Sequence, residues 1–76
     1  GEYEVIEAEI IETSELITKE IKNSNLPDDI RIGAVLRNKK VIIPKSDFIF
    51  QKNDNVVFIA KNDSIPIVEN IFRLSQ

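Results

Sequence analysis

Residue types that carry much of enzyme chemistry are missing from this chain. It contains no cysteine and no histidine, and only two of its 76 residues are glycine. The chain therefore has no disulfide, no thiolate or imidazole ligand for zinc, and neither a cysteine nucleophile nor a histidine base. Two glycines are also too few for the glycine-rich loops that hold nucleotide phosphates in Rossmann folds and in Walker A motifs.

Long hydrophobic runs are absent as well. The longest candidate is the short apolar run at residues 56–60, whereas a membrane-spanning helix needs about 20 apolar residues. We therefore expect any role at a membrane to be exercised from its aqueous side.

Length and composition predict one small domain. A chain of 76 residues buries only about 60 to 65% of the surface that its unfolded form exposes. Hydrophobic residues make up 42% of the sequence, too many for a disordered chain. Because the chain starts at Gly1 and contains no methionine, we expect residues 1–76 to be a single domain excised from a larger protein. So small a core favours association with a second copy or a neighbouring domain.

The net charge of −3 is divided unevenly along the chain. Residues 1–29 contain nine acidic and two basic residues, for −7, and residues 30–76 contain eight basic and four acidic residues, for +4. A basic binding surface would explain this division. Opposite charges on neighbouring strands or in a self-complementary dimer explain it equally well, and we favour that interpretation.

Hydrophobic periodicity places a strand and a short helix in the first third of the chain. Residues 3–12 alternate between apolar and acidic side chains in their middle, which predicts a half-buried strand. Thr13 and Ser14 can cap a following amphipathic helix, whose apolar residues recur at helical spacing: Leu16, Ile17 and Ile21. Pro27 and the polar residues before it end this segment.

A hairpin follows. Residues 30–37 and 40–43 predict two strands joined by the turn residues Asn38 and Lys39, because asparagine tolerates a positive φ. The even-numbered residues of 30–36 are apolar and are expected to share the buried face. Pro44 ends the second strand.

The last third predicts two more strands and a helix. Residues 48–50 form a short apolar piece, and the run at 56–60 is typical of a central strand covered on both faces. Asp63 or Ser64 caps a final helix with a buried stripe of Ile65, Val68, Ile71 and Phe72. The predicted fold is α+β, in the order β-α-β-β-β-β-α, with two helices packed on a small mixed sheet.

Acidic and hydroxyl side chains offer no convincing catalytic site. Glu7 and Glu9 would lie about 7 Å apart on one strand face, and we interpret them as solvated charges. The aspartates lack the oxygen spacing of an EF-hand loop, so turn and cap roles are favoured for Asp28, Asp29, Asp47 and Asp54. The serines have no histidine to activate them. We therefore predict no catalytic residue, no metal site and no enzymatic activity.

Basic residues gather around the predicted hairpin. Arg31 and Arg37 would project from the same side of one strand and could bind a small anionic ligand. A nucleic-acid partner is less favoured, because the four phenylalanines have the apolar neighbours of a core and leave only Tyr3 for stacking on bases: Phe48, Phe50, Phe58 and Phe72.

The order of these motifs resembles the C-terminal domain of the TrkA family, also called the RCK C-terminal domain. The strand at 31–37 reads RIGAVLR, the apolar run at 41–43 is closed by Pro44, and Asp47 and Asp54 follow at the positions of two aspartates in the family pattern. Thr18 stands where the family usually has a glycine after the helix start, and Asn38-Lys39 replaces an acidic residue and glycine in the hairpin turn. In the loops, Ser46 and Asn53 stand in place of glycines. Both residue types suit turns, so we expect altered loop detail rather than another fold.

The resemblance implies a cytoplasmic regulatory domain of a potassium uptake protein, at the inner face of the membrane through its transporter. In such proteins it is attached to a Rossmann domain, which alone would bind NAD or ATP, or to a membrane transporter subunit. It forms homodimers, and some members bind cyclic di-AMP, a small anionic effector, in a pocket between two copies. The corresponding ligand-binding residues in this chain are Arg31, Ile32 and Pro44, although Asp28 and Asp29 nearby would repel an anion.

Two other hypotheses remain open. The domain could be a structural tether of a membrane transporter or antiporter, with no ligand of its own. It could also be a small nucleic-acid binder that uses the basic hairpin, although we expect no nucleic-acid partner.

Overall fold

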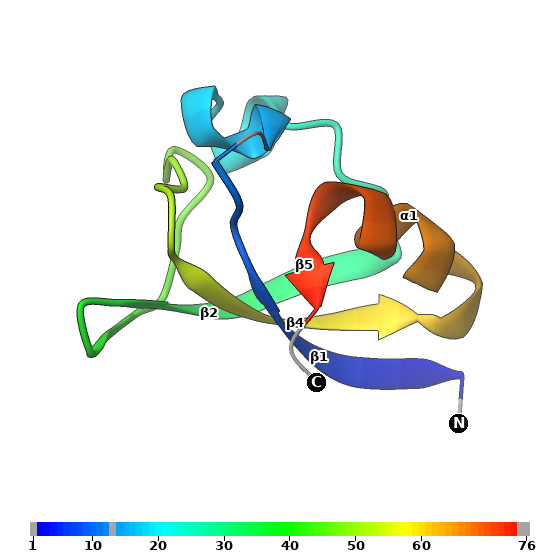
Figure 1. Ribbon diagram of the computed structural model, residues 1–76. Helices are drawn as coiled ribbons and strands as arrows, with labels where there is room; N and C mark the ends of the chain where they lie inside the picture. The colour runs from blue at the N-terminus through cyan, green and yellow to red at the C-terminus, as the bar shows by residue number, and fades with distance from the viewer. Residues whose placement is uncertain (1, 13, 75–76) are drawn as a thin grey trace.

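The structure, a computed structural model, describes residues 2–12 and 14–74. Its elements are β1 (Tyr3–Glu9), the 3-10 turns η1 (Glu15–Thr18) and η2 (Ile21–Asn23), β2 (Ile30–Arg37), β3 (Lys40–Ile42), β4 (Asn55–Lys61), the 3-10 turn η3 (Asn62–Ser64), α1 (Ile65–Ile71) and β5 (Arg73–Leu74). The strands form one sheet in the order β3-β2-β4-β1-β5 (Figure 1). The predicted α+β class is confirmed. Every described strand pair is antiparallel, however, so the sheet is not mixed.

Strand β4 lies at the centre of the sheet, as its apolar run predicts. It pairs with β1 from Tyr3↔Lys61 to Glu9↔Asn55 and with β2 from Ile30↔Ala60 to Leu36↔Asn55. The acidic N-terminal strand and the basic hairpin therefore flank the same central strand on opposite sides.

The β2–β3 hairpin turns as the sequence predicts. Asn38 and Lys39 have φ values of 52° and 67°, and a tight two-residue turn of type I′ requires a positive φ at both positions. The strands are paired at Arg37↔Lys40, Leu36↔Val41 and Val35↔Ile42. Strand β3 ends at Ile42, one residue earlier than predicted.

A β-bulge at Gly33 overturns the predicted alternation of β2. Ile32 pairs with Phe58 and Ala34 pairs with Val57, so Gly33 is an extra residue in β2. Such an insertion exchanges the two faces for every residue beyond it. Ile30 and Ile32 face the core as expected, but beyond the bulge the core residue is Val35 rather than Ala34.

The predicted first helix is wrong: two separate 3-10 turns take its place. Ser14 does cap the first turn, since its hydroxyl accepts a hydrogen bond from the Leu16 amide at 3.2 Å. The two amides that would continue a helix bond elsewhere, with Ile21 N donating to Phe48 O and Lys22 N to Ser46 O, each at 2.9 Å. Hydrogen bonds to a distant loop thus replace the i→i−4 bonds of an α-helix.

Two predicted strand limits also change. The first strand ends at Glu9 rather than residue 12, although Ile10 remains tied to the next loop, where its amide donates to Asp54 O at 2.9 Å. Residues 48–50 form no strand of their own. They make only an isolated bridge, Glu20↔Ile49.

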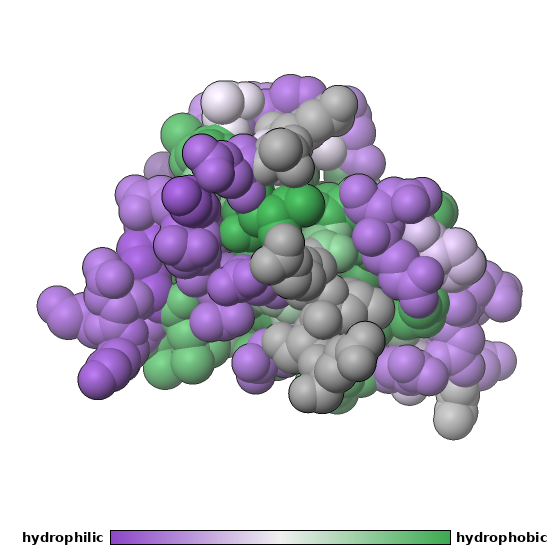
Figure 2. Space-filling view, viewed as in Figure 1, coloured by the Kyte–Doolittle hydropathy of each residue, from purple (hydrophilic) through white to green (hydrophobic). Residues whose placement is uncertain are grey.

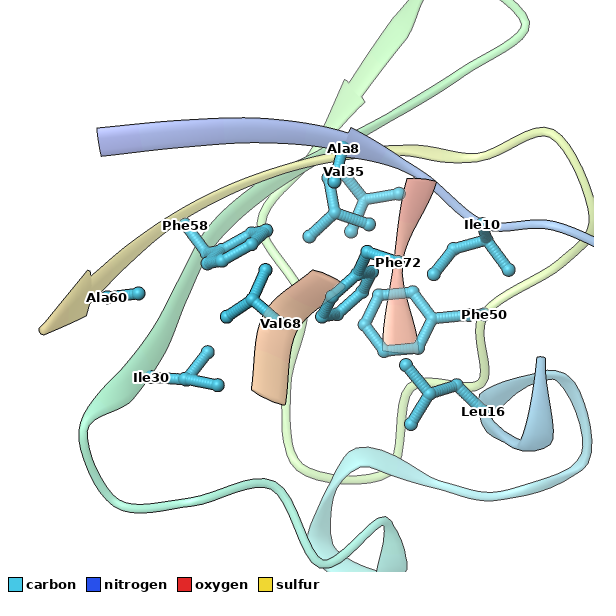
Figure 3. Packing of buried hydrophobic residues seen from close by; sticks show 11 residues of the cluster. Ala8, Ile10, Leu16, Ile30, Val35, Phe50, Phe58, Ala60, Val68 and Phe72 are labelled. Carbon is cyan, nitrogen blue, oxygen red and sulfur yellow. The ribbon is translucent and has the colours of Figure 1, made fainter. Parts of the chain in front are cut away.

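One hydrophobic core joins the sheet, α1 and the 3-10 turns. Val68 is fully buried and Phe72, at the C-cap of α1, is 3% exposed, and the Phe72 ring stacks on Phe58 with centroids 4.9 Å apart. Phe50 and Leu16 extend the cluster toward the N-terminal turns (Figure 3). The predicted final helix is confirmed, with Pro66 in its first turn.

The two faces of the sheet differ. In Figure 1, α1 and the 3-10 turns lie on the same side, and no described element covers the other side. The expectation that residues 56–60 are covered on both faces is therefore wrong for the single chain. Val56, Phe58 and Ala60 are buried, but Ile59 on the opposite face is 45% exposed.

Candidate functional site

A groove of about 350 Å³ lies beside the outer edge of β2. Strand β3 covers that edge only at residues 35–37, so the N-terminal half of β2 has no partner strand on this side among the described pairings. The groove is lined by residues of η2, the loop at 25–28, the first half of β2 and the loop at 44–46. Arg31, Ile32 and Pro44, the three residues that the family resemblance indicates, all line it.

Local backbone geometry holds the walls of the groove. Asn25 adopts a positive φ of 57°, which turns the chain from η2 toward β2 and suits asparagine better than most residues. The Ile30 amide donates to Pro27 O at 3.0 Å, closing the turn that leads into β2. The bonds from the amides of η2 to Ser46 O and Phe48 O hold the opposite wall in place.

The groove combines an apolar floor with a basic rim. Its apolar residues are Ile21, Leu26, Pro27, Ile30, Ile32 and Pro44, and its charged residues are Lys22, Asp28, Arg31 and Lys45. Three cations against one acid suit a ligand that has both anionic and flat apolar parts. Asp28 opposes an anion on one side of the groove, as the sequence suggests.

The basic residues at the rim of the groove differ in the contacts that they make with the rest of the chain. Lys22 makes an exposed ion pair with Glu20, with Nζ and Oε2 3.7 Å apart. Such a pair in solvent contributes little and yields readily to a better partner. Arg31 is exposed and makes no hydrogen bond or ion pair with the described residues. Its guanidinium is thus available for a ligand.

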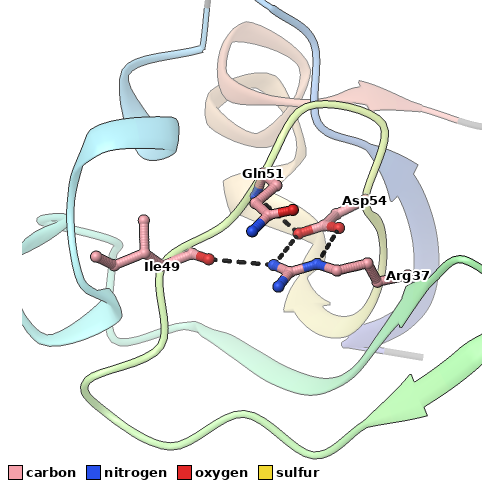
Figure 4. Close-up of polar contacts among 4 residues, drawn as sticks. All are labelled: Arg37, Ile49, Gln51 and Asp54. Carbon is pink, nitrogen blue, oxygen red and sulfur yellow. Dashed lines mark hydrogen bonds and ion pairs between the residues drawn. The ribbon is translucent and has the colours of Figure 1, made fainter.

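Arg37 is not part of this groove, so the predicted pair of Arg31 and Arg37 on one side of β2 is wrong. The bulge at Gly33 places the two arginines on opposite faces of the sheet. Arg37 instead forms a bidentate ion pair with Asp54, in which Nε donates to Oδ1 at 2.8 Å and Nη2 donates to Oδ2 at 2.7 Å (Figure 4). Sequence periodicity could not show this, because it assumes an unbroken strand.

The Arg37–Asp54 pair stabilises the conformation of the loop before β4. The Asp54 side chain is 1% exposed and also accepts from the Gln51 amide at 2.8 Å. Arg37 donates to Ile49 O at 3.2 Å, and its guanidinium carbon lies 4.8 Å from the centroid of the Phe48 ring. The hydrogen bonds to Asp54 raise the pKa of Arg37 above its ordinary value, against the opposing effect of burial. Asp54 therefore serves structure, as its interpretation as a turn residue anticipates.

Other candidate chemistry remains dispersed. Glu7 and Glu9 lie on the uncovered face of the sheet, opposite Val57 and Asn55 of β4. Among residues 2–12 and 14–74, no group of three or more acidic side chains is placed to hold a metal ion. No helix in that part of the chain is long and apolar enough to cross a membrane.

A second hollow of about 280 Å³ lies between the N-terminal turns and the end of α1. Ser24, which lines it, donates its hydroxyl hydrogen to Ile21 O at 2.6 Å. Ser14 accepts the cap bond of Leu16 there. Both hydroxyls are thus used in hydrogen bonds within the fold.

Sequence reasoning missed one cation of the groove, Lys22, and placed Lys45 only among the basic residues around the hairpin. Each lies in a segment that reads as a helix end or a loop, and neither belongs to a motif. Only the family description of the pocket, which places its walls before the second strand and at the hairpin proline, could have indicated them.

Known proteins match both the sequence and the fold. Residues 5–73 match the TrkA-C domain family. The Trk system potassium uptake protein TrkA of Azorhizobium caulinodans is 43% identical over 75 residues, which is 99% of this chain and 16% of that protein. The Trk system potassium uptake protein TrkA homolog of Archaeoglobus fulgidus is 34% identical over 64 residues, 84% of this chain and 15% of that protein. This chain thus spans less than a fifth of the length of either relative.

Two solved structures share the fold. One is the RCK_C domain dimer of S. agalactiae BusR in complex with c-di-AMP, with a TM-score of 0.76 and 22% identity over 93% of this chain and 91% of that chain. The other is an RCK domain "with cda", with a TM-score of 0.75 and 15% identity over 91% of this chain and 97% of that chain. With the family match over residues 5–73, the conclusion is that this chain belongs to the TrkA-C domain family.

Proposed function

We propose that this chain is the effector-sensing and dimerising domain of a potassium uptake protein, and that its groove binds cyclic di-AMP. One observation carries the proposal: Arg31, Ile32 and Pro44 meet in a single groove that has an apolar floor and a basic rim. The family, the Trk relatives and the c-di-AMP complex of BusR support the same assignment.

The chemistry of cyclic di-AMP fits this groove. Its two phosphodiesters each carry a negative charge, and its adenines have flat apolar faces. Lys22, Arg31 and Lys45 can pair with a phosphate, while the side chains of Ile32 and Pro44 offer the surface on which a purine packs. Three basic residues against Asp28 leave the rim with an excess of positive charge.

Signalling would follow from linkage rather than catalysis. An effector that binds one arrangement of two domains more tightly than another shifts the population toward the tightly bound arrangement. The size of this shift is limited by the difference between its affinities for the two arrangements. The attached Rossmann domain or membrane transporter subunit would then respond to that shift. The domain itself would act in the cytoplasm, without enzymatic activity and without a resident cofactor.

Calorimetric titration of cyclic di-AMP into the chain tests the proposal. We expect saturable heat, and we expect Arg31→Ala to weaken binding by about ten- to a hundredfold, because a charge-assisted hydrogen bond contributes about 1.5 to 3 kcal/mol. Lys40→Ala is the matched control, since Lys40 lies on β3 outside the groove, and its affinity should be unchanged.

The same titration separates the alternatives. Heat with ATP or NAD but not with cyclic di-AMP would contradict the choice of effector. No heat and no thermal shift with any of these compounds would overturn effector sensing and favour the structural tether.

A further inference from the structure

The second hollow is separate from the groove. It measures about 280 Å³ and lies between the N-terminal 3-10 turns and the end of α1. Ile21 and Lys22 of this 3-10 segment line the groove, whereas Lys19 and Ser24 line the second hollow, and no described residue lines both. Ligand pockets usually measure about 300 to 1,000 Å³. The second hollow therefore suits a small molecule.

The floor of the second hollow is apolar. Three aliphatic side chains line it: Ile11, Leu16 and Ile71. Leu16 is 3% exposed and belongs to the core, and Ile71 packs against that core. Figure 2 shows hydrophobic side chains reaching the surface between the N-terminal turns and the end of α1. The packing of the domain thus holds in place a surface on which a short hydrocarbon chain can lie.

Polar side chains of the second hollow retain hydrogen-bonding capacity. The Ser14 hydroxyl accepts from the Leu16 amide at 3.2 Å, so its own hydrogen is left to donate. Lys19 and Asn70 are exposed, and their side chains make no hydrogen bond or ion pair with the side chains that the structure describes. A hydroxyl, an ammonium and an amide can all donate to a carboxylate.

The charge of the second hollow favours an anion. Lys19 is the only charged residue among the described residues that line it. Two acids near it in sequence pair with other lysines, Glu12 with Lys52 at 3.5 Å and Glu20 with Lys22 at 3.7 Å. The C-terminus of α1 opposes an anion, but a helix end carries at most about half an elementary charge. The full charge of Lys19 therefore prevails.

We propose that the second hollow binds a small aliphatic carboxylate, with the carboxylate at Lys19, Ser14 and Asn70 and the hydrocarbon chain on the apolar floor. A neutral aliphatic compound would leave the ammonium of Lys19 without a counter-charge. An anion without a hydrocarbon chain would leave the floor uncovered. The hollow and the groove share no described residue, so each site can be tested without the other.

NMR titration of the isotopically labelled chain with sodium valerate, at constant pH and ionic strength, tests the proposal. We expect the amide resonances of Ser14, Lys19 and Asn70 to move and saturate together at about millimolar ligand, because so small a ligand has limited affinity. The amides of Ile32 and Lys45 in the groove should remain still.

Two further probes separate the contributions of charge and chain. Valeramide, the uncharged isostere of valerate, should bind at least about tenfold more weakly, because it cannot form a charge-assisted hydrogen bond with Lys19. Acetate keeps the charge but lacks the chain, and it should also bind more weakly than valerate.

Variants of one lysine test its role. Lys19→Gln should weaken valerate binding at least about fivefold, and Lys19→Arg, which keeps the charge, should largely retain it. Lys22→Gln is the matched control, since Lys22 is a lysine of the same 3-10 segment that lines the groove instead. It should leave valerate binding unchanged.

Three results would overturn the proposal: no saturable shift with valerate, equal affinities for valerate and valeramide, or equal losses in Lys19→Gln and Lys22→Gln. If Lys19→Gln disturbs folding by circular dichroism, the comparison of valerate with valeramide on the unchanged chain still decides. Failure of the proposed function is read separately, as missing heat with cyclic di-AMP.

Discussion

Two arginines of one strand have opposite environments. Arg31 reaches solvent beside a groove and has no partner among the described residues, whereas Arg37 is engaged by a carboxylate that is 1% exposed. The cause is a single inserted residue, Gly33, which turns the second half of β2 over. One arginine is thus free for a ligand, and the other is committed to the fold.

Removing the charge of Arg37 should therefore destabilise the chain. We expect Arg37→Met to lower the free energy of unfolding by about 2 to 3 kcal/mol, because it leaves the buried Asp54 carboxylate without its cation while keeping much of the volume over Phe48. Arg31→Met, in the same strand, should change it by less than about 0.5 kcal/mol. Urea denaturation measures both values, and equal losses for the two variants would contradict the assigned roles.

The pH dependence of this pair has a defined sign. The pKa of Arg37 is raised in the folded chain. The stability that the charged Arg37 contributes to the fold is therefore fully present below the ordinary arginine pKa, and it is lost only as the pH rises through the still higher pKa of the folded state. The difference in stability between wild type and Arg37→Met should thus persist from neutral to mildly alkaline pH.

At the scale of elements, local rules located β1 to β4 and the hairpin turn. They also predicted a strand at 48–50 that does not form, and they did not predict β5, the bulge or the 3-10 turns. Positive φ values at Asn38 and Asn53, 52° and 72°, follow from the turn chemistry of asparagine, and Asn53 takes the place of a family glycine. The 3-10 segment depends instead on the amides of Ile21 and Lys22 bonding to residues 48 and 46, and no local pattern contains that information. Of the groove residues, Arg31 was indicated by its place in the basic hairpin, whereas Ile32 and Pro44 were predictable only through the family resemblance.

The β2–β3 turn offers a test of backbone strain. Lys39 has a φ of 67°, and the left-handed region costs a non-glycine residue about 1 kcal/mol. Lys39→Gly should therefore raise the free energy of unfolding by about 0.5 to 1 kcal/mol. Lys40→Gly, one residue later in β3, should lower it by a similar amount, because glycine is unfavourable within a strand. A loss of stability on Lys39→Gly would contradict the turn geometry.

At the scale of the whole molecule, three regions of the domain differ in character. The core and the Arg37–Asp54 pair lie on the covered side of the sheet, the groove lies at the outer edge of β2, and the opposite face of the sheet exposes apolar side chains such as Val5 and Ile59. A domain of this size has a total stability of only about 4 to 11 kcal/mol. Ligand and partner binding can therefore shift a large part of it, which suits a sensing domain.

Binding of cyclic di-AMP in the groove is tested most directly by an NMR titration of the isotopically labelled chain with this ligand. The amide resonances of Arg31, Ile32 and Lys45 should move and saturate together, while those of Ile67 and Asn70 on α1 remain still. No change at saturating ligand, or changes centred on the second hollow at Ser24 and Asn70, would contradict binding of cyclic di-AMP in the groove.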